Sequence, residues 1–431
     1  MVHNQYCVLN AGRQAAECFP QFFTGLKMKE RGTVGYINRN KIRFSILILL
    51  TVLFASTPVA ALQDTGAVLP QSEDIIEEKL KNNEIKTIKE TIDKALSKSQ
   101  ISKAYNLTSE EIIENSLKGK PLESLKGLPK ILGAILGKEI KVNIALTVQL
   151  LAIMLLGAVI RALQPLESGI PNEVAKLGVN SILIIVAAVS FGNAVDIAKK
   201  TIETMQHTAS VAMPALIALM AASGKIVTVT AMQPLMLAAV NIACQIFKTI
   251  LLPVTVMAGT LFLVDSVSER FKLSSLAKLL KSCAVWITGV ITLLFSILMS
   301  IQKIAGSSID AVTIKTTRFA IGTFIPVAGK YMSDAAETIL HCTAAVSNIA
   351  GILTVIGLGL IFVIPFIKVF VIMAAFRIAA AVGAPICDEN ICDALTDSAG
   401  CISLMLGIMG ASLFVIILLT GTLISSSGVM G

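Results

Sequence analysis

Long apolar stretches separated by short polar ones dominate the chain from about residue 142 to its end. Four of them have the length and low charge of membrane-spanning helices: residues 142–160, 177–195, 283–301 and 401–424. Two longer apolar tracts, 231–265 and 349–386, each contain a proline with a lysine near it. Each tract fits either two abutting spans or one long kinked helix, because neighbouring helices can re-satisfy the carbonyls that a proline frees. The pattern predicts an all-α polytopic membrane protein with seven to nine transmembrane helices.

Residues 62–141 form a polar module ahead of the membrane domain, which we place at 142–431. Apolar residues recur in this module at spacings that suit amphipathic helices: Ile75, Ile76, Leu80, Ile85, Ile88, Ile92 and Leu96. The stretch "NLTSEEI" predicts a second helix start, with Thr108 or Ser109 as the cap and acids in the first turn. We expect a small helical module with a modest core, too small for an ordinary catalytic domain.

The stretch "NKIRFSILILLTVLFASTPVAALQD" has the parts of a secretory signal. We predict a cytoplasmic leader at 1–43 and a signal peptide at 44–61, although an uncleaved first span fits the same residues. The leader carries seven basic residues against two acids, a net charge of +5. Met28 heads a shorter leader and is an alternative translation start. A signal here would place the module at 62–141 outside the cytoplasm.

One polar connection anchors the predicted topology. Residues 265–282 carry Arg270, Lys272, Lys278 and Lys281, which the positive-inside rule assigns to the cytoplasm. The next span then places residues 302–348 outside. The acidic loop "CDENICDALTDSAGC" also falls outside if the tract at 349–386 is two spans. There, Cys387 and Cys392 either pair as a disulfide or remain free thiols.

Composition agrees with the membrane class and excludes others. The chain is 55% hydrophobic and 15% charged, and its mean hydropathy is +0.79. Its net charge of +8 is concentrated before the first hydrophobic segment, without a basic patch interleaved with aromatics, so no nucleic-acid partner is expected. We find no phosphate loop, no zinc-ligand spacing and no nucleophile–base arrangement, and we expect no catalytic residue, cofactor or metal.

Four polar residues inside apolar tracts are candidates for function, because charge within a membrane is costly and usually faces protein or water. These candidate intramembrane residues are Asn241, Lys248, Lys368 and Arg377. For Lys248 and Lys368, snorkelling from the end of a span is an equally good interpretation. Beside Arg377, small residues recur every fourth position at Ala375, Ala379 and Gly383, a pattern typical of close helix packing.

The stretch "TTRFAIGTFIPVAGKYMSDAAETIL" (316–340) interrupts the membrane pattern. Its apolar run is too short to span, and its glycines and proline bend the chain. Asp334 and Glu337 resemble a capping box that opens a new helix. We predict a re-entrant or interfacial elbow at 310–339 that contacts a pore or a partner, and an ordinary loop is the alternative. Its candidate contact residues are Arg318, Gly322, Pro326, Gly329, Lys330, Asp334 and Glu337.

The block "DAVTIKTTRFAIGTFIPVAGKYMSDAAETI" closely resembles the signature region of the stage III sporulation protein AE family. The stretches "MPALIALMAASG" (213–224) and "KLSSLAKLLK" (272–281) resemble that family too, and the likeness covers roughly residues 40–431. The resemblance implies a component of the secretion-like apparatus between mother cell and forespore in endospore-forming bacteria, in the mother-cell membrane that surrounds the forespore. It implies other stage III sporulation A-series proteins as partners, including a secretion-type ATPase, and indirect contact with stage II sporulation protein Q across the intermembrane space.

Two functions from different classes therefore remain. The first is a non-enzymatic membrane component of a sporulation channel complex that acts by assembly with partners and the lipid bilayer. The second is a stand-alone permease that moves a small solute along a path lined by polar residues such as Asn241, Lys248 and Arg377.

Overall fold

The computed structural model describes residues 83–97, 109–118, 127–163, 170–266, 273–324 and 329–427. All of them belong to one compact unit, Thr51–Gly431, whereas the other unit, Met1–Leu50, lies outside the described residues. The predicted leader and signal peptide also lie outside them. Every element in the described part is a helix and none is a strand, which confirms the predicted all-α class.

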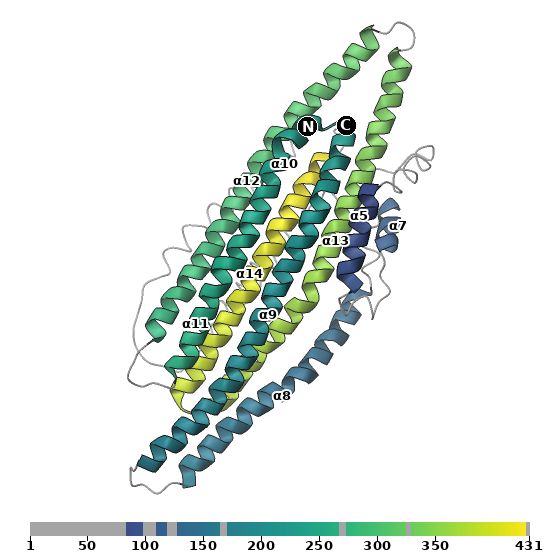
Figure 1. Ribbon diagram of the computed structural model, residues 1–431. Coiled ribbons are helices and arrows are strands. Elements are labelled where there is room, and N and C mark those ends of the chain that lie inside the picture. The colour runs from purple at the N-terminus through teal and green to yellow at the C-terminus, as the bar shows by residue number, and fades with distance from the viewer. Residues whose placement is uncertain are drawn as a thin grey trace, which may run out of the picture. The chain divides into compact units, whose positions relative to one another are not determined.

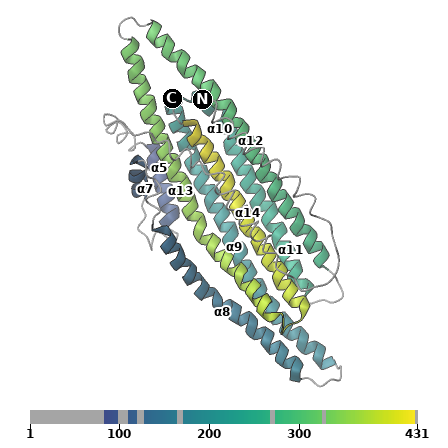
Figure 2. The same cartoon turned by 180° about the vertical axis from the view of Figure 1, so that it is seen from behind.

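Ten helical elements make up the described part of the chain (Figure 1). In chain order they are α5 (Asn83–Ser97), α7 (Ser109–Leu117), α8 (Leu128–Leu163), α9 (Ile170–Ala222), α10 (Ile226–Ile246), the π-helix η3 (Phe247–Leu251), α11 (Leu252–Asp265), α12 (Ser274–Phe324), α13 (Gly329–Gly383) and α14 (Glu389–Ser427). The long helices run up and down beside one another in a bundle, as Figures 1 and 2 show from opposite sides.

Six helices among the described residues are long and apolar enough to cross a membrane. Both ambiguous tracts form continuous helices. The tract at 231–265 runs through α10, η3 and α11, and the tract at 349–386 lies almost entirely on α13 with Pro365 inside it. Six spans are therefore supported, and the larger number of seven to nine is not reached within the described part.

Several of these helices are much longer than a bilayer is thick. With 55 residues, α13 is about 80 Å long at 1.5 Å per residue, whereas the hydrocarbon core measures about 30 Å. The 53 residues of α9 and the 51 of α12 give similar lengths. Large parts of these helices must therefore lie outside the hydrocarbon, where other protein or water covers them.

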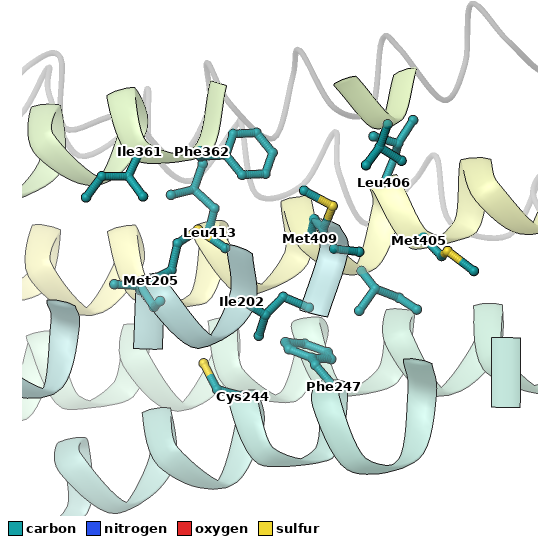
Figure 3. Packing of buried hydrophobic residues seen from close by; sticks show 14 of the residues in the cluster. Ile202, Met205, Cys244, Phe247, Ile361, Phe362, Met405, Leu406, Met409 and Leu413 are labelled. Atoms are coloured by element: carbon teal, nitrogen blue, oxygen red, sulfur yellow. The ribbon is translucent and has the colours of Figure 1, made fainter. Parts of the chain in front are cut away.

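The core of the bundle lies around α13 and α14, which pack against each other and against α9, and α14 also packs against α11. Figure 3 shows one region of it, where Ile202 and Met205 of α9, Phe247 of η3, and Met409 and Leu413 of α14 meet. Ile202, Met205, Phe247 and Met409 are fully buried. Side-chain volume therefore fills the space between these helices.

Helix α5 packs on α9 and on the middle of α13. Its buried residues are Ile85, Ile88, Ile92 and Leu96, which confirms the predicted amphipathic pattern. Ile92 packs so closely on α13 that its Cγ2 would lie 2.8 Å from a Cβ added at Gly357. The apolar start of the tract at 349–386 is thus explained by burial against protein.

Helix α7 extends this cover. Asp93 Oδ2 accepts a 2.8 Å hydrogen bond from Ser109 Oγ, and Lys89 pairs with Glu110. The predicted helix at "NLTSEEI" is confirmed, and its Ser109 hydroxyl bonds to α5. The predicted boundary at 141/142 falls inside α8, which continues unbroken from Leu128 to Leu163.

Candidate functional site

A polar seam joins the outward faces of α9 and α10–η3. Its central contact is an ion pair between Lys248 Nζ and Glu203 Oε1, at 2.9 Å. The two side chains keep 31% and 39% of their surface exposed, so the pair lies at the surface of the bundle. Lys248, a predicted candidate, thus has an anionic partner that the sequence analysis did not name.

Asn241 provides the second contact of the seam. Its Oδ1 accepts hydrogen bonds from Gln206 Nε2 at 3.2 Å and from Ser210 Oγ at 3.4 Å. Its Nδ2 donates to the Leu237 carbonyl, 2.9 Å away and one turn back in α10. We define the polar seam as Glu203, Gln206, Ser210, Asn241 and Lys248.

Helical periodicity brings these residues together. Glu203, Gln206 and Ser210 are spaced i, i+3, i+7 on α9, and Asn241 and Lys248 are two turns apart on the neighbouring helix. The helices run in opposite directions, so Glu203 meets Lys248 and Ser210 meets Asn241. This spacing in α9 was the available sequence signal for the missed partners.

The Lys248 side of the seam lies on the π-helix. The backbone N–H of Leu252 bonds to the Phe247 carbonyl five residues back, which widens the helix by one residue. Pro253 follows at the start of α11 and has no N–H to donate to the preceding turn. Such π segments occur frequently at functional sites.

Behind the seam the described interior is mainly apolar. On the inward faces of the same helices, Met205, Ala209, Cys244 and Phe247 have no exposed surface (Figure 3). The Thr208 hydroxyl is buried nearby and donates to its own helix at the Thr204 carbonyl. The seam can therefore offer hydrogen bonds and charge to a neighbour at the surface of the bundle, and the described interior beside it holds no polar path.

Lys368 belongs to a different contact. Its Nζ lies 3.7 Å from Glu139 Oε1 on α8, and the Glu139 side chain is only 11% exposed. Farther along, Gly383 packs against the Met154 sulfur. In both contacts the α13 residue follows its α8 partner by the same number of residues. Helix α8 therefore runs parallel to α13 in a fixed register.

Arg377 is half-buried on α13 and joins neither the seam nor the Glu139–Lys368 pair. The small residues of its helix are buried: Ala375 is 4% exposed, Ala379 is 0% exposed, and Gly383 contacts α8. Close packing along this face agrees with the predicted small-residue pattern. The candidate permease residues Asn241, Lys248 and Arg377 are therefore not assembled into one lining.

Most of the predicted elbow at 310–339 lies on two helices. Residues up to Phe324 continue α12, so Gly322 and the backbone of Arg318 are helical, and α13 begins at Gly329. Asp334 was predicted to cap this helix, but the helix begins five residues earlier because no breaker lies between Gly329 and Asp334. Lys330, Asp334 and Glu337 therefore follow the helix start.

Pro326 and the rest of 325–328 lie outside the described residues, as do the side chains of Arg318, Lys330, Asp334 and Glu337. In Figures 1 and 2 the joined ends of α12 and α13 reach beyond the neighbouring helices. The bend itself was predicted around Pro326, outside the described residues, so the re-entrant or interfacial elbow stays a prediction.

The acidic loop lies at the same end of the bundle as the basic connection at 265–282. Lys281 Nζ is 3.7 Å from Asp397 Oδ1 and 5.5 Å from the ring centre of Phe262. A Cβ added at Gly400 would overlap this ammonium group, so α14 fits around Lys281. The loop was predicted on the opposite side only if the tract at 349–386 is two spans, and that tract is one helix. Within the described residues, no disulfide joins Cys387 and Cys392.

Comparison with known proteins agrees with the resemblance in the sequence. The family model described as stage III sporulation protein AE matches residues 107–427. The chain is 28% identical over 356 residues to stage III sporulation protein AE of Bacillus subtilis (strain 168), covering 80% of this chain and 88% of that one. No solved structure matches it. With the family model matching most of its length, the chain belongs to the stage III sporulation protein AE family.

Proposed function

We propose that this chain is a non-enzymatic integral membrane component of a secretion-like channel complex between mother cell and forespore, which endospore formation needs. Its place would be the mother-cell membrane around the forespore. Membership of a sporulation family supports the process, and six helices able to cross a membrane support the location in a bilayer. Its action would be assembly, with other proteins supplying chemical energy.

The observation that carries the assembly proposal is the outward position of the polar seam. Lys248 has three donors and meets one carboxylate, and Asn241 and Gln245 are exposed beside it. Exposed apolar residues flank them, with Ile242 at 59% and Ile250 at 49% exposure. Apolar side chains beside polar groups that can still form hydrogen bonds suit a protein–protein contact, where such groups pair across the interface.

The partners proposed for this surface are other stage III sporulation A-series proteins. Among them, a secretion-type ATPase would supply nucleotide hydrolysis, and stage II sporulation protein Q would be reached indirectly. The joined ends of α12 and α13 form a second candidate contact, because they extend beyond the neighbouring helices (Figure 1).

A stand-alone permease needs a polar path through the chain. Against it stand the buried apolar side chains between α9, η3 and α14 and the separation of Arg377 from the seam. A path formed between several chains, with the seam facing it, is compatible with the proposed complex.

The test is complementation of an endospore-forming strain that lacks its own family member. The variant Glu203→Lys/Lys248→Glu keeps both charges and exchanges them, and Lys86→Glu/Glu90→Lys on α5 is the matched control. We expect the seam exchange to reduce heat-resistant spores and co-purification of A-series proteins, with membrane levels unchanged. Solute flux through the purified wild-type chain alone in liposomes would contradict the proposal and establish the permease.

A further inference from the structure

The α8–α9 hairpin presents an apolar band to its surroundings. Exposed apolar residues run from Val142 to Val159 on α8 and from Leu177 to Val189 on α9. The band on α8 is about 26 Å high at 1.5 Å per residue, close to the thickness of a hydrocarbon core. This surface is suited to lipid chains.

Four exposed lysines lie at one end of this band: Lys138 and Lys141 on α8, and Lys199 and Lys200 on α9. The close approach of Gly157 and Val179, whose Cγ1 would lie 2.9 Å from an added Cβ, fixes the register of the two helices. Counted from that contact, the lysines lie about 24–31 Å along their helices. Two helices that run in opposite directions thus place their lysines at the same height.

Helix α13 marks the same height independently. Lys368 meets Glu139 there, beside Lys138 in sequence. Beyond it, α5 packs on Gly357 and turns Lys86 and Glu90 outward, each with 69% of its side chain exposed. On α8 and α9 the surface on one side of the lysines is apolar, and on the other side α5 presents charged side chains.

The net charge at this height is positive. Glu139 is the acid of α8 there, and Lys368 already occupies it. On α9, Asp196 is the exposed acid between Val189 and Lys200. Four ammonium groups therefore face one free carboxylate at the edge of a lipid-sized apolar band.

We propose that Lys138, Lys141, Lys199 and Lys200 form a basic belt that binds the phosphate groups of anionic phospholipids at the membrane surface. Long lysine side chains can keep their stems along the apolar band while their ammonium groups reach the headgroups. Continuity with the apolar band identifies the occupant as lipid. The belt requires only that the chain crosses a membrane and is independent of its role in sporulation.

The belt has consequences for α9 and α13. The polar seam begins at Glu203, about one turn beyond Lys199 and Lys200, so it lies on the headgroup side of the belt. The part of α13 that α5 covers also lies beyond the belt. With the belt at the membrane surface, its apolar residues would be buried against protein and not against lipid.

The test uses the purified full chain in vesicles that contain spin-labelled phosphatidylglycerol or phosphatidylcholine as the probe. We expect the wild type to prefer phosphatidylglycerol, and substitution of the four belt lysines by Gln to reduce that preference at least about fivefold, because one lysine near a surface contributes roughly that factor. The matched control replaces Lys86, Lys94, Lys118 and Lys130, all exposed on α5, the end of α7 and the start of α8, with Gln. It should keep the preference, as should a variant with Arg at the four belt positions.

Three outcomes would overturn the belt: no preference in the wild type, full preference in the Gln variant, or an equal loss in the control. If the wild type showed no lipid preference but its four lysines bound an acidic protein, the surface would belong to that protein and the belt would be overturned. Sporulation of the Gln variant is a separate measurement, so failure of the belt and failure of the proposed function remain distinguishable.

Discussion

The central helices α13 and α14 and the outer helices α8 and α12 are all strongly apolar, but they use that character differently. In their most apolar windows, 50% of α13 and 56% of α14 is buried inside the bundle, against 17% for both α8 and α12. On α12, Trp286 and Leu294 are 51% and 60% exposed, whereas Phe376 of α13 is fully buried. Hydropathy therefore indicates that a helix avoids water, and packing decides whether lipid or protein replaces it.

The largest difference in stability should appear when an aromatic ring is removed from a central helix and from an outer helix. Phe376→Ala leaves a cavity in α13, and we expect a loss of about 3 kcal/mol, at the low end for such changes because detergent also solvates the unfolded helix. Trp286→Ala on α12 should change stability by less than about 0.5 kcal/mol. Thermal unfolding of the purified chain in detergent measures both, and equal losses would refute the distinction between central and outer helices.

A second comparison adds a methyl group instead. A Cβ at Gly259 of α11 would overlap the Phe191 ring, whereas nothing lies within 4 Å of a Cβ at Gly289 of α12. Gly259→Ala should cost about 1–3 kcal/mol, because the ring has to shift. Gly289→Ala should be neutral or stabilise by up to about 1 kcal/mol through helix propensity. The same unfolding measurement decides, and a neutral Gly259→Ala would mean that this contact is loose.

The ion pair between an outer and a central helix tests how α8 is anchored. Glu139→Gln leaves Lys368 without its carboxylate, and we expect a loss of about 1–2 kcal/mol, since Glu139 is nearly buried while Lys368 keeps access to water. Limited proteolysis should detect earlier release of α8. Glu139→Gln/Lys368→Met should recover part of the loss, and a double variant worse than either single change would contradict the pairing.

The smallest expected effect on stability is at the polar seam. Because Glu203 and Lys248 are each about one-third exposed, their coupling energy should be only about 0.5–1 kcal/mol. A double-mutant cycle with Glu203→Gln and Lys248→Gln measures it in the isolated chain. A coupling energy several times larger would mean that the pair mainly stabilises the bundle. It would contradict the interpretation of the seam as a contact surface.

Local patterns predicted much of this architecture. The amphipathic spacing of Ile85, Ile88 and Ile92 predicted α5 and its buried face, because helical periodicity depends on nearby residues alone. The apolar tracts predicted the membrane helices for the same reason. The block at 310–339 identified the family, although its predicted cap at Asp334 was wrong by five residues, because a capping pattern does not fix where a helix begins.

The candidate site shows where that reasoning stopped. Asn241, Lys248 and Lys368 stood out because each is a polar residue in an apolar tract. Their partners Gln206, Glu203 and Glu139 lie on helices distant in sequence, and only the packing of those helices brings them within reach. The side of the acidic loop likewise depended on whether the tract at 349–386 is one helix or two spans, and only the continuous α13 decided between them.

By itself the sequence determined that the chain is helical, that it crosses a membrane and which family it belongs to. These properties depend on composition, periodicity and local motifs. Only the tertiary structure decided which apolar faces meet protein, with α5 covering α13 at Gly357 and lipid-sized surface left on α8. It also decided which charges pair. The physical reason is that burial and ion pairing depend on contacts between segments far apart in the chain. The hydropathy of a helix does not show whether lipid or another helix covers it.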